Sequence, residues 1–199
     1  MPNEPGSGEL TGRTILVTGG TTGIGLAMAT ALYDAGANLV ITARNAARGT
    51  EAQLELGDRA MFIAQDAIQE SGWDRVIGGL DARFGWLDGV INNVGGSGMM
   101  ANIAYVSPET FTRICDLNIR ATLLGMQKGY RAMKGNPDGG AIVNIASIKK
   151  QVPLRRYSAP RGKSSSRPAS PRFPSSSSSF RSPRNALMSI RPLDSIWRM

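Results

Sequence analysis

A run of glycines between a strand-like and a helix-like segment is the first feature of this sequence that could support chemistry. These glycines follow the β-rich run 14–18 and open a segment of apolar periodicity. At such a strand-to-helix turn the backbone can come close to a phosphate, and the amides at the helix N-terminus can bind it. We therefore interpret the loop as a phosphate cradle, whose candidate residues are Gly19, Thr21, Thr22, Gly23, Ile24 and Gly25.

A basic residue follows the second strand-like run, residues 38–42. Dinucleotide-binding folds have at this point either an acidic residue that binds the ribose 2′-hydroxyl of NAD or a cation that suits the 2′-phosphate of NADP. The segment 41–45 contains Arg44 and no acidic residue. The sequence therefore favours NADP(H) over NAD(H), and a solvent-exposed loop arginine is the alternative interpretation.

The amino-acid composition excludes several kinds of catalytic site. The sequence contains no histidine and one cysteine, Cys115. This excludes Ser-His-Asp triads, metal sites with histidine ligands and an internal disulfide, so acid–base chemistry must come from Tyr, Ser, Lys, Arg or carboxylates. The polar N-terminal residues 1–12, and apolar runs too short to span a bilayer, predict a cytoplasmic protein with no membrane partner.

From residue 13 onward, short β-rich runs alternate with longer segments of helical periodicity, which is typical of a parallel sheet covered by helices on both faces. We predict an α/β fold, a Rossmann-like doubly wound parallel sheet of about five strands, with a ligand crevice outside the carboxyl ends of the strands. The predicted strands are residues 14–18, 38–42, 60–64, 89–92 and 141–145, and the predicted helices are 24–35, 46–56, 73–84 and 108–133.

The composition changes after about residue 152. The last 49 residues contain 13 Ser, 7 Pro and 10 basic residues against one acidic residue, a charge of about +9, whereas residues 1–150 carry about −1. We expect a flexible N-terminus (1–12), a nucleotide-binding domain (13–158) and a disordered, basic Ser/Pro/Arg-rich tail (159–199). Nucleic-acid binding by this tail is only a weak alternative, because the tail lacks interleaved aromatic residues at useful density.

Five motifs, in order along roughly residues 11–160, together resemble the short-chain dehydrogenase/reductase family. They are the glycine loop, Asp66 after the third strand, Asn92-Asn93-Val94-Gly95 after the fourth strand, Asn118 in the long helix and Ser147 after the fifth strand. The resemblance implies an NAD(P)-dependent oxidoreductase acting on a small carbonyl or alcohol substrate. It also implies that Asp66 contacts the adenine ring, and that Asn93 and Gly95 flank the cofactor.

The resemblance assigns catalysis to Asn118, which would hold a proton-relay water, Ser147, which would orient the substrate oxygen, and Tyr157, which would act as acid and base. A phenol with an ordinary pKa near ~10 needs a neighbouring cation to act as a base near neutrality. The family has a lysine four residues after this tyrosine, where this chain has Arg161, and Pro160 interrupts the helix. The alternative function is therefore a non-catalytic or defective nucleotide-binding remnant.

A change of reading frame would explain the unusual tail. Residues 162–173 can be encoded by bases that, read one base earlier, specify an apolar-periodic helix of the kind that follows the catalytic lysine in this family. We hypothesise a frameshift near residues 158–162. The chain as written would lack the final strands of the family and part of the surface through which its members associate, so the homo-oligomer expected for the family stays an open question.

Overall fold

The computed structural model of the chain describes residues 8–96 and 105–147. The chain divides into two units, Met1–Ala159 and Pro160–Met199, and all the described residues belong to the first unit. The predicted tail, residues 159–199, lies outside the described residues. The domain boundaries therefore stay predictions.

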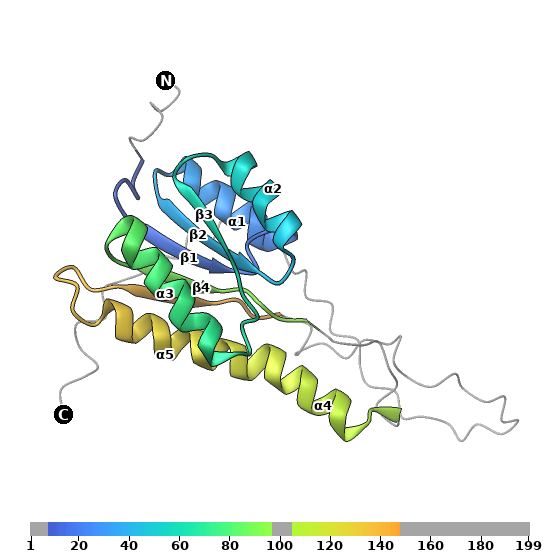
Figure 1. Ribbon diagram of the computed structural model, residues 1–199. Coiled ribbons are helices and arrows are strands. Elements are labelled where there is room, and N and C mark those ends of the chain that lie inside the picture. Colours follow the sequence, from blue (N-terminus) through green and yellow to red (C-terminus); the bar gives the residue numbers. More distant parts are fainter. Residues whose placement is uncertain (1–7, 97–104, 148–199) are drawn as a thin grey trace, which may run out of the picture. The chain divides into compact units, whose positions relative to one another are not determined.

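Five parallel strands form one sheet with the order β3-β2-β1-β4-β5 (Figure 1). The predicted α/β fold is thereby confirmed, and the strand bounds differ from the predictions by one residue at most. The second strand is one residue longer than predicted and the fifth is one residue shorter. The strands are β1 Thr14–Thr18, β2 Asn38–Ala43, β3 Ala60–Ala64, β4 Gly89–Asn92 and β5 Ala141–Asn144.

The helices lie where they were predicted, with two corrections. The predicted helix 108–133 is not one regular α-helix, because the π-helical turn Asp116–Arg120 interrupts it. The third helix begins three residues before the predicted start at Trp73, because the poor helix former Gly72 is buried against Gln65 and is held in the helix by packing. The α-helices are α1 Gly23–Asp34, α2 Ala46–Leu56, α3 Glu70–Phe84, α4 Pro108–Cys115 and α5 Ala121–Met133.

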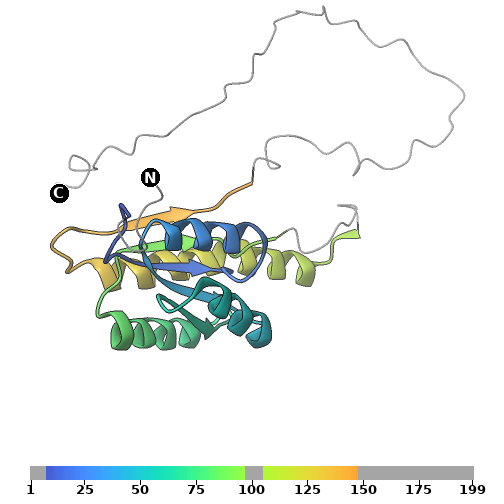
Figure 2. The same cartoon turned by 90° about the horizontal axis from the view of Figure 1, so that it is seen from above.

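Helices cover both faces of the sheet. Successive side chains of a strand point to opposite faces, so Leu16 and Val17 of β1 belong to two different hydrophobic clusters. The cluster around Val17 includes side chains of α1 and α2, and the cluster around Leu16 includes side chains of α3 and α5, which lie next to each other in Figures 1 and 2. Both faces of the central strands are thus buried, as is typical of a doubly wound parallel sheet.

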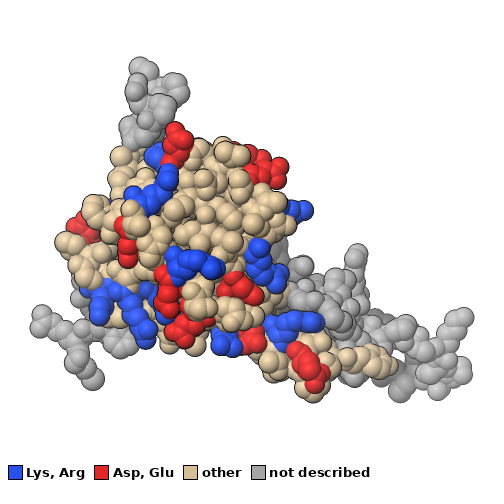
Figure 3. Space-filling model, viewed as in Figure 1, with Lys and Arg blue, Asp and Glu red and all other residues tan. Residues whose placement is uncertain are grey.

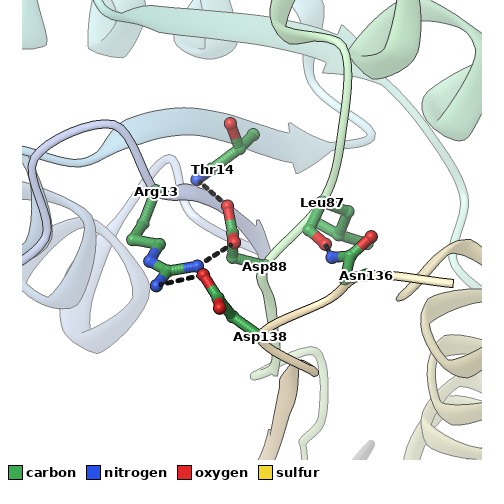
Figure 4. A network of polar contacts seen from close by, with 6 residues as sticks. All are labelled: Arg13, Thr14, Leu87, Asp88, Asn136 and Asp138. Carbon is green, nitrogen blue, oxygen red and sulfur yellow. Dashed lines mark hydrogen bonds and ion pairs between the residues drawn. The ribbon is translucent and has the colours of Figure 1, made fainter. Parts of the chain in front are cut away.

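A polar network ties three segments together at the amino end of the sheet (Figure 4). Arg13 donates to Asp88 Oδ1 at 2.9 Å and to Asp138 Oδ2 at 3.1 Å, and the second Asp88 oxygen accepts the Thr14 N–H at 2.8 Å. These hydrogen bonds raise the pKa of Arg13 above its ordinary value. The network joins the start of β1, the start of β4 and the turn before β5.

Acidic and basic side chains are interspersed on the face of the folded unit seen in Figure 3. Lys128 of α5, for example, lies 3.1 Å from Glu70 and 2.7 Å from Asp74, both of α3. This mixture agrees with the charge of about −1 carried by residues 1–150. None of the helices in the described ranges is long and apolar enough to cross a membrane.

Candidate functional site

The strand order creates a switch point between β1 and β4. From β1 the chain runs outward through β2 to β3, and it then returns to the other side of β1 as β4. The loops that leave the carboxyl ends of two such strands diverge, and ligands of doubly wound sheets bind in the resulting crevice. The glycine loop 19–25 follows β1 and the loop 93–96 follows β4, so both lie at this switch point.

Backbone geometry explains why the loop after β1 contains glycines. Gly19 and Gly23 have φ values of +65° and +54°, a region that other residues rarely adopt. A Cβ atom on Gly25 would lie 2.0 Å from the backbone oxygen of Gly19, so this position requires a residue without a side chain. A Cβ atom on Gly23, in contrast, would have nothing within 4 Å, which leaves the backbone open to a ligand.

The N-terminus of α1 suits a diphosphate. Its first turn contains no acidic residue, and its N-cap residue Thr22 makes no capping hydrogen bond through its side chain. The first N–H groups of a helix have no partner within the helix, and the helix dipole favours an anion there. Thr21 is buried, whereas Ile24 is 71% exposed beside this turn. The residues present therefore fit the pyrophosphate of a dinucleotide.

Thr18, at the end of β1, connects the two loops of the crevice. Its hydroxyl oxygen accepts the N–H groups of Asn93 at 3.0 Å and Val94 at 3.2 Å. The Asn93 side chain donates in return to the backbone oxygens of Thr18 at 3.1 Å and Gly19 at 3.2 Å. Sequence reasoning placed Thr18 at the end of the first strand but gave it no role in the site, although a polar residue at the end of a buried strand, next to a glycine loop, was a usable signal.

Arg44 and Asp66 lie along the same edge of the sheet as the glycine loop. Arg44 directly follows β2 and is exposed, and Asp66 follows β3 and is partly buried. The Asp66 carboxylate accepts the N–H of Ile68 at 3.4 Å. The two side chains come from neighbouring strands, because Ala43 of β2 pairs with Ala64 of β3.

Asn118 lies in the π-helical turn and attaches the loop after β4 to the long helical segment. Its Oδ1 accepts the N–H of Gly96 at 3.0 Å, and its Nδ2 donates to the backbone oxygens of Gly96 and Ile114, both at 2.8 Å. Its own backbone oxygen accepts the hydroxyl of Thr122 at 3.0 Å. A Cβ atom on Gly95 would lie 3.0 Å from the Asn118 side chain.

Ser147 follows β5 at the carboxyl edge of the sheet. Asn92 of β4 pairs with Asn144 of β5, and the side-chain amide of Asn92 donates to the side chain of Asn144 at 2.9 Å. This contact fixes the end of β5 three residues before Ser147. The other two predicted catalytic residues, Tyr157 and Arg161, lie outside the described residues.

A comparison with protein families shows to which family this chain belongs. A family model described as short chain dehydrogenase matches residues 13–159. The chain belongs to the short-chain dehydrogenase family. Membership confirms the resemblance predicted from the five sequence motifs, and proteins of this family bind NAD or NADP.

Individual short-chain dehydrogenases resemble this chain over most of its folded unit. The 3-beta-hydroxysteroid dehydrogenase of Comamonas testosteroni is 34% identical over 75% of this chain and 58% of its own length. The NADP-dependent (R)-specific alcohol dehydrogenase of Lentilactobacillus kefiri is 33% identical over 77% of this chain and 63% of its own length. The chain therefore spans about six tenths of the length of these short-chain dehydrogenases.

A solved structure from the same family has the same fold. The 3-ketoacyl-(acyl-carrier-protein) reductase from Brucella melitensis, complexed with NADH, matches with a TM-score of 0.68 and 32% identity. The match covers 71% of this chain and 59% of the reductase. One short-chain dehydrogenase above is thus described as NADP-dependent, whereas this structure contains NADH.

Proposed function

We propose that this protein is an NAD(P)-dependent oxidoreductase that acts on a small carbonyl or alcohol substrate. The observation that carries the proposal is the junction of the glycine loop and the loop after β4 at the switch point, where Asn93 bonds to both Thr18 and Gly19. The bound dinucleotide would supply or accept the hydride. Gly19, Thr21, Thr22, Gly23, Ile24 and Gly25 would bind its pyrophosphate.

The remaining proposed roles are those that the resemblance to the short-chain dehydrogenase family implies. Asp66 would contact the adenine ring, and Asn93 and Gly95 would flank the dinucleotide. Ser147 would donate a hydrogen bond to the substrate oxygen. Asn118, whose side chain attaches the loop after β4 to the helical segment, would hold the water that relays a proton.

We propose Tyr157 as the acid and base, with the Arg161 guanidinium lowering its pKa. An opposite charge close to a phenolate favours the ionised form and so lowers the pKa of the phenol. Arg161 has the required charge, but a planar guanidinium differs from an ammonium in shape and in donor geometry. This substitution supports the second candidate function, a nucleotide-binding protein without turnover.

We propose NADP(H) as the preferred dinucleotide, since Arg44 is exposed directly after β2 and segment 41–45 contains no acidic residue. The L. kefiri relative, which is described as NADP-dependent, is in keeping with this preference.

Calorimetric titration of the 199-residue chain with each dinucleotide, followed by a turnover assay on a panel of ketones and alcohols, tests both candidate functions. Binding with turnover that is abolished in Tyr157→Phe supports the oxidoreductase. Binding of the same dinucleotides without any turnover supports the second candidate. Absence of binding to all four dinucleotides, NAD, NADH, NADP and NADPH, overturns both.

A further inference from the structure

The side-chain amide of Asn144, the last residue of β5, bridges two other elements. Its Oδ1 accepts the side-chain N–H of Asn92, at the end of β4, at 2.9 Å. Its Nδ2 donates to the sulfur of Met126, on α5, at 3.3 Å. Asparagine is depleted in strands, so strand propensity does not explain this residue. The two bonds do explain it, because an amide has both an acceptor oxygen and a donor nitrogen.

Asn92 is a rigid partner for this bridge. It is 3% exposed, and a Cβ atom on Gly125 of α5 would overlap its Oδ1. The α5 backbone therefore packs directly against this side chain and confines it. Among the described residues, Oδ1 of Asn92 has no hydrogen-bond partner, and the bond from its Nδ2 to Asn144 is the one that its side chain makes. Loss of the Asn144 amide would leave the buried Asn92 side chain unpaired, which is unfavourable.

The end of β5 depends strongly on this bridge. Among the described strands, β5 lies at the edge of the sheet and pairs with β4 alone. One residue beyond β5, the N–H of Ile145 donates to the backbone oxygen of Asn92 at 2.9 Å. Ser147 follows two residues later. The place of Ser147 is therefore set by how firmly residues 144 and 145 are attached to β4 and α5.

The three bridged elements lead to candidate residues of the site. β5 leads to Ser147, β4 leads to Asn93, and α5 continues the π-helical turn that contains Asn118. We propose that Asn144 is a positioning residue, which holds Ser147 in place relative to Asn118 and the bound dinucleotide. The inference rests on the proposed function and deepens it. Such a residue matters for rate, because a displacement of reacting groups by about 1 Å can slow a reaction about a hundredfold.

The test compares the wild type with Asn144→Leu, Asn144→Asp and Val143→Ala. Leucine is similar in size to asparagine but makes no hydrogen bond, whereas aspartate keeps an oxygen that accepts the Asn92 N–H. Val143→Ala is the control, because Val143 is 42% exposed and its side chain lies on the opposite face of the same strand. The measurements are kcat and KM, calorimetric titration with NADPH and NADH, the melting temperature, and hydrogen exchange of the Ile145 amide.

We expect Asn144→Leu to lower kcat about tenfold, an effect of the size that one lost hydrogen bond produces. The affinity for the dinucleotides should stay unchanged, and the Ile145 amide should exchange faster because the end of β5 is released. Asn144→Asp should recover most of the lost kcat. Val143→Ala should lower the melting temperature slightly and leave kcat unchanged, which separates the positioning of Ser147 from the stability of β5.

Four results would overturn the inference. Unchanged kcat in Asn144→Leu would do so while leaving the proposed function intact. Equal losses of kcat in Asn144→Leu and Val143→Ala would make Asn144 an ordinary structural residue of β5. Lower kcat without faster Ile145 exchange would show that the effect does not pass through the end of the strand. Dinucleotide binding without turnover in the wild type would overturn the oxidoreductase proposal itself, and the role of Asn144 with it.

Discussion

At the scale of single residues, Gly25 is the most constrained position of the candidate site. A Cβ atom there would lie 2.0 Å from the backbone oxygen of Gly19 and 2.6 Å from the Asn93 side-chain nitrogen. The first contact involves backbone on both sides, so no side-chain rotation can relieve it. The glycine loop, α1 and the loop after β4 therefore meet at one point that tolerates no added atom.

Gly25→Ala is expected to destabilise the protein by about 1–3 kcal/mol, because overpacking of a tight contact forces the backbone to shift. We also expect dinucleotide binding to be lost, since the shift moves the N-terminus of α1 away from Gly19. Urea denaturation followed by circular dichroism, and calorimetric titration with NADPH, measure the two effects.

Gly78→Ala is the matched control. Gly78 lies in the middle of α3, and a Cβ atom there would have nothing within 4 Å. Alanine has the higher helix propensity, so this variant should gain about 0.5–1 kcal/mol and keep its dinucleotide affinity. Equal stability changes in the two variants would contradict the packing argument.

At the scale of elements, the π-helical turn Asp116–Arg120 attaches the long helical segment to the loop after β4. The attachment is made by the side chain of Asn118, which hydrogen-bonds to Gly96. Asn118→Ala removes all three side-chain hydrogen bonds, and we expect a loss of about 1–3 kcal/mol, since the groups left behind lose their partners. Hydrogen exchange should show faster exchange of the Gly96 amide, whose bond to Asn118 is gone.

Thr122→Val, in the first turn of α5, provides the comparison. It removes only the hydroxyl that bonds to the backbone oxygen of Asn118, so the expected loss is about 0.5–1.5 kcal/mol and the Gly96 amide should stay protected. If both variants accelerate Gly96 exchange equally, the attachment is made by the helix as a whole rather than by the Asn118 side chain.

The ion pairs that Lys128 of α5 forms with Glu70 and Asp74 of α3 make the stability of the protein depend on pH in the alkaline range. The hydrogen bonds that Lys128 donates to the carboxylates of Asp74 and Glu70 raise its pKa above the ordinary value of 10.5. Because the pKa of Lys128 is higher in the folded state than in the unfolded state, the protonated lysine stabilises the folded state. This stabilisation is fully present below pH 10.5 and is lost as the pH rises through the pKa of the folded state.

Lys128→Met should lower the melting temperature at pH 7, and the difference from the wild type should shrink as the pH rises above about 10.5, the ordinary pKa of Lys128. Thermal melts between neutral and strongly alkaline pH measure this. Lys134→Met is the control, because Lys134 follows α5 and has no ion pair within the described ranges. A difference that stays constant with pH would show that packing of the lysine stem, not its charge, stabilises the contact.

At the scale of the whole molecule, the sheet and its helices could be predicted from sequence because their signals are local. Apolar runs separated by glycine and proline breaks gave the bounds of all five strands to within one residue. Contacts across the fold could not be predicted in this way. Thr18 and Asn93 are 75 positions apart, and their pairing depends on β4 lying next to β1. The π-helical turn escaped prediction because its side-chain pattern continues that of the flanking α-helices.

The end of the family match provides a separate prediction. The match stops at residue 159, close to the point where Ser, Pro and Arg begin to dominate the sequence. We expect sequencing of both DNA strands to reveal a one-base change near codons 158–162, after which the shifted frame encodes an apolar-periodic helix. An intact mass of the native protein equal to 21.2 kDa, the mass of the chain as written, together with an unchanged DNA sequence, would contradict the frameshift hypothesis.

The network of Arg13, Asp88 and Asp138 lies at the amino end of the sheet, and every described candidate residue of the dinucleotide site lies at the carboxyl end. A five-residue strand such as β1 separates the two ends by about 15 Å. Substitutions at that distance combine additively. The amino end can therefore be strengthened to compensate for substitutions elsewhere. Added stability there would offset the loss of stability that accompanies a change of cofactor preference at Arg44, without altering the preference obtained.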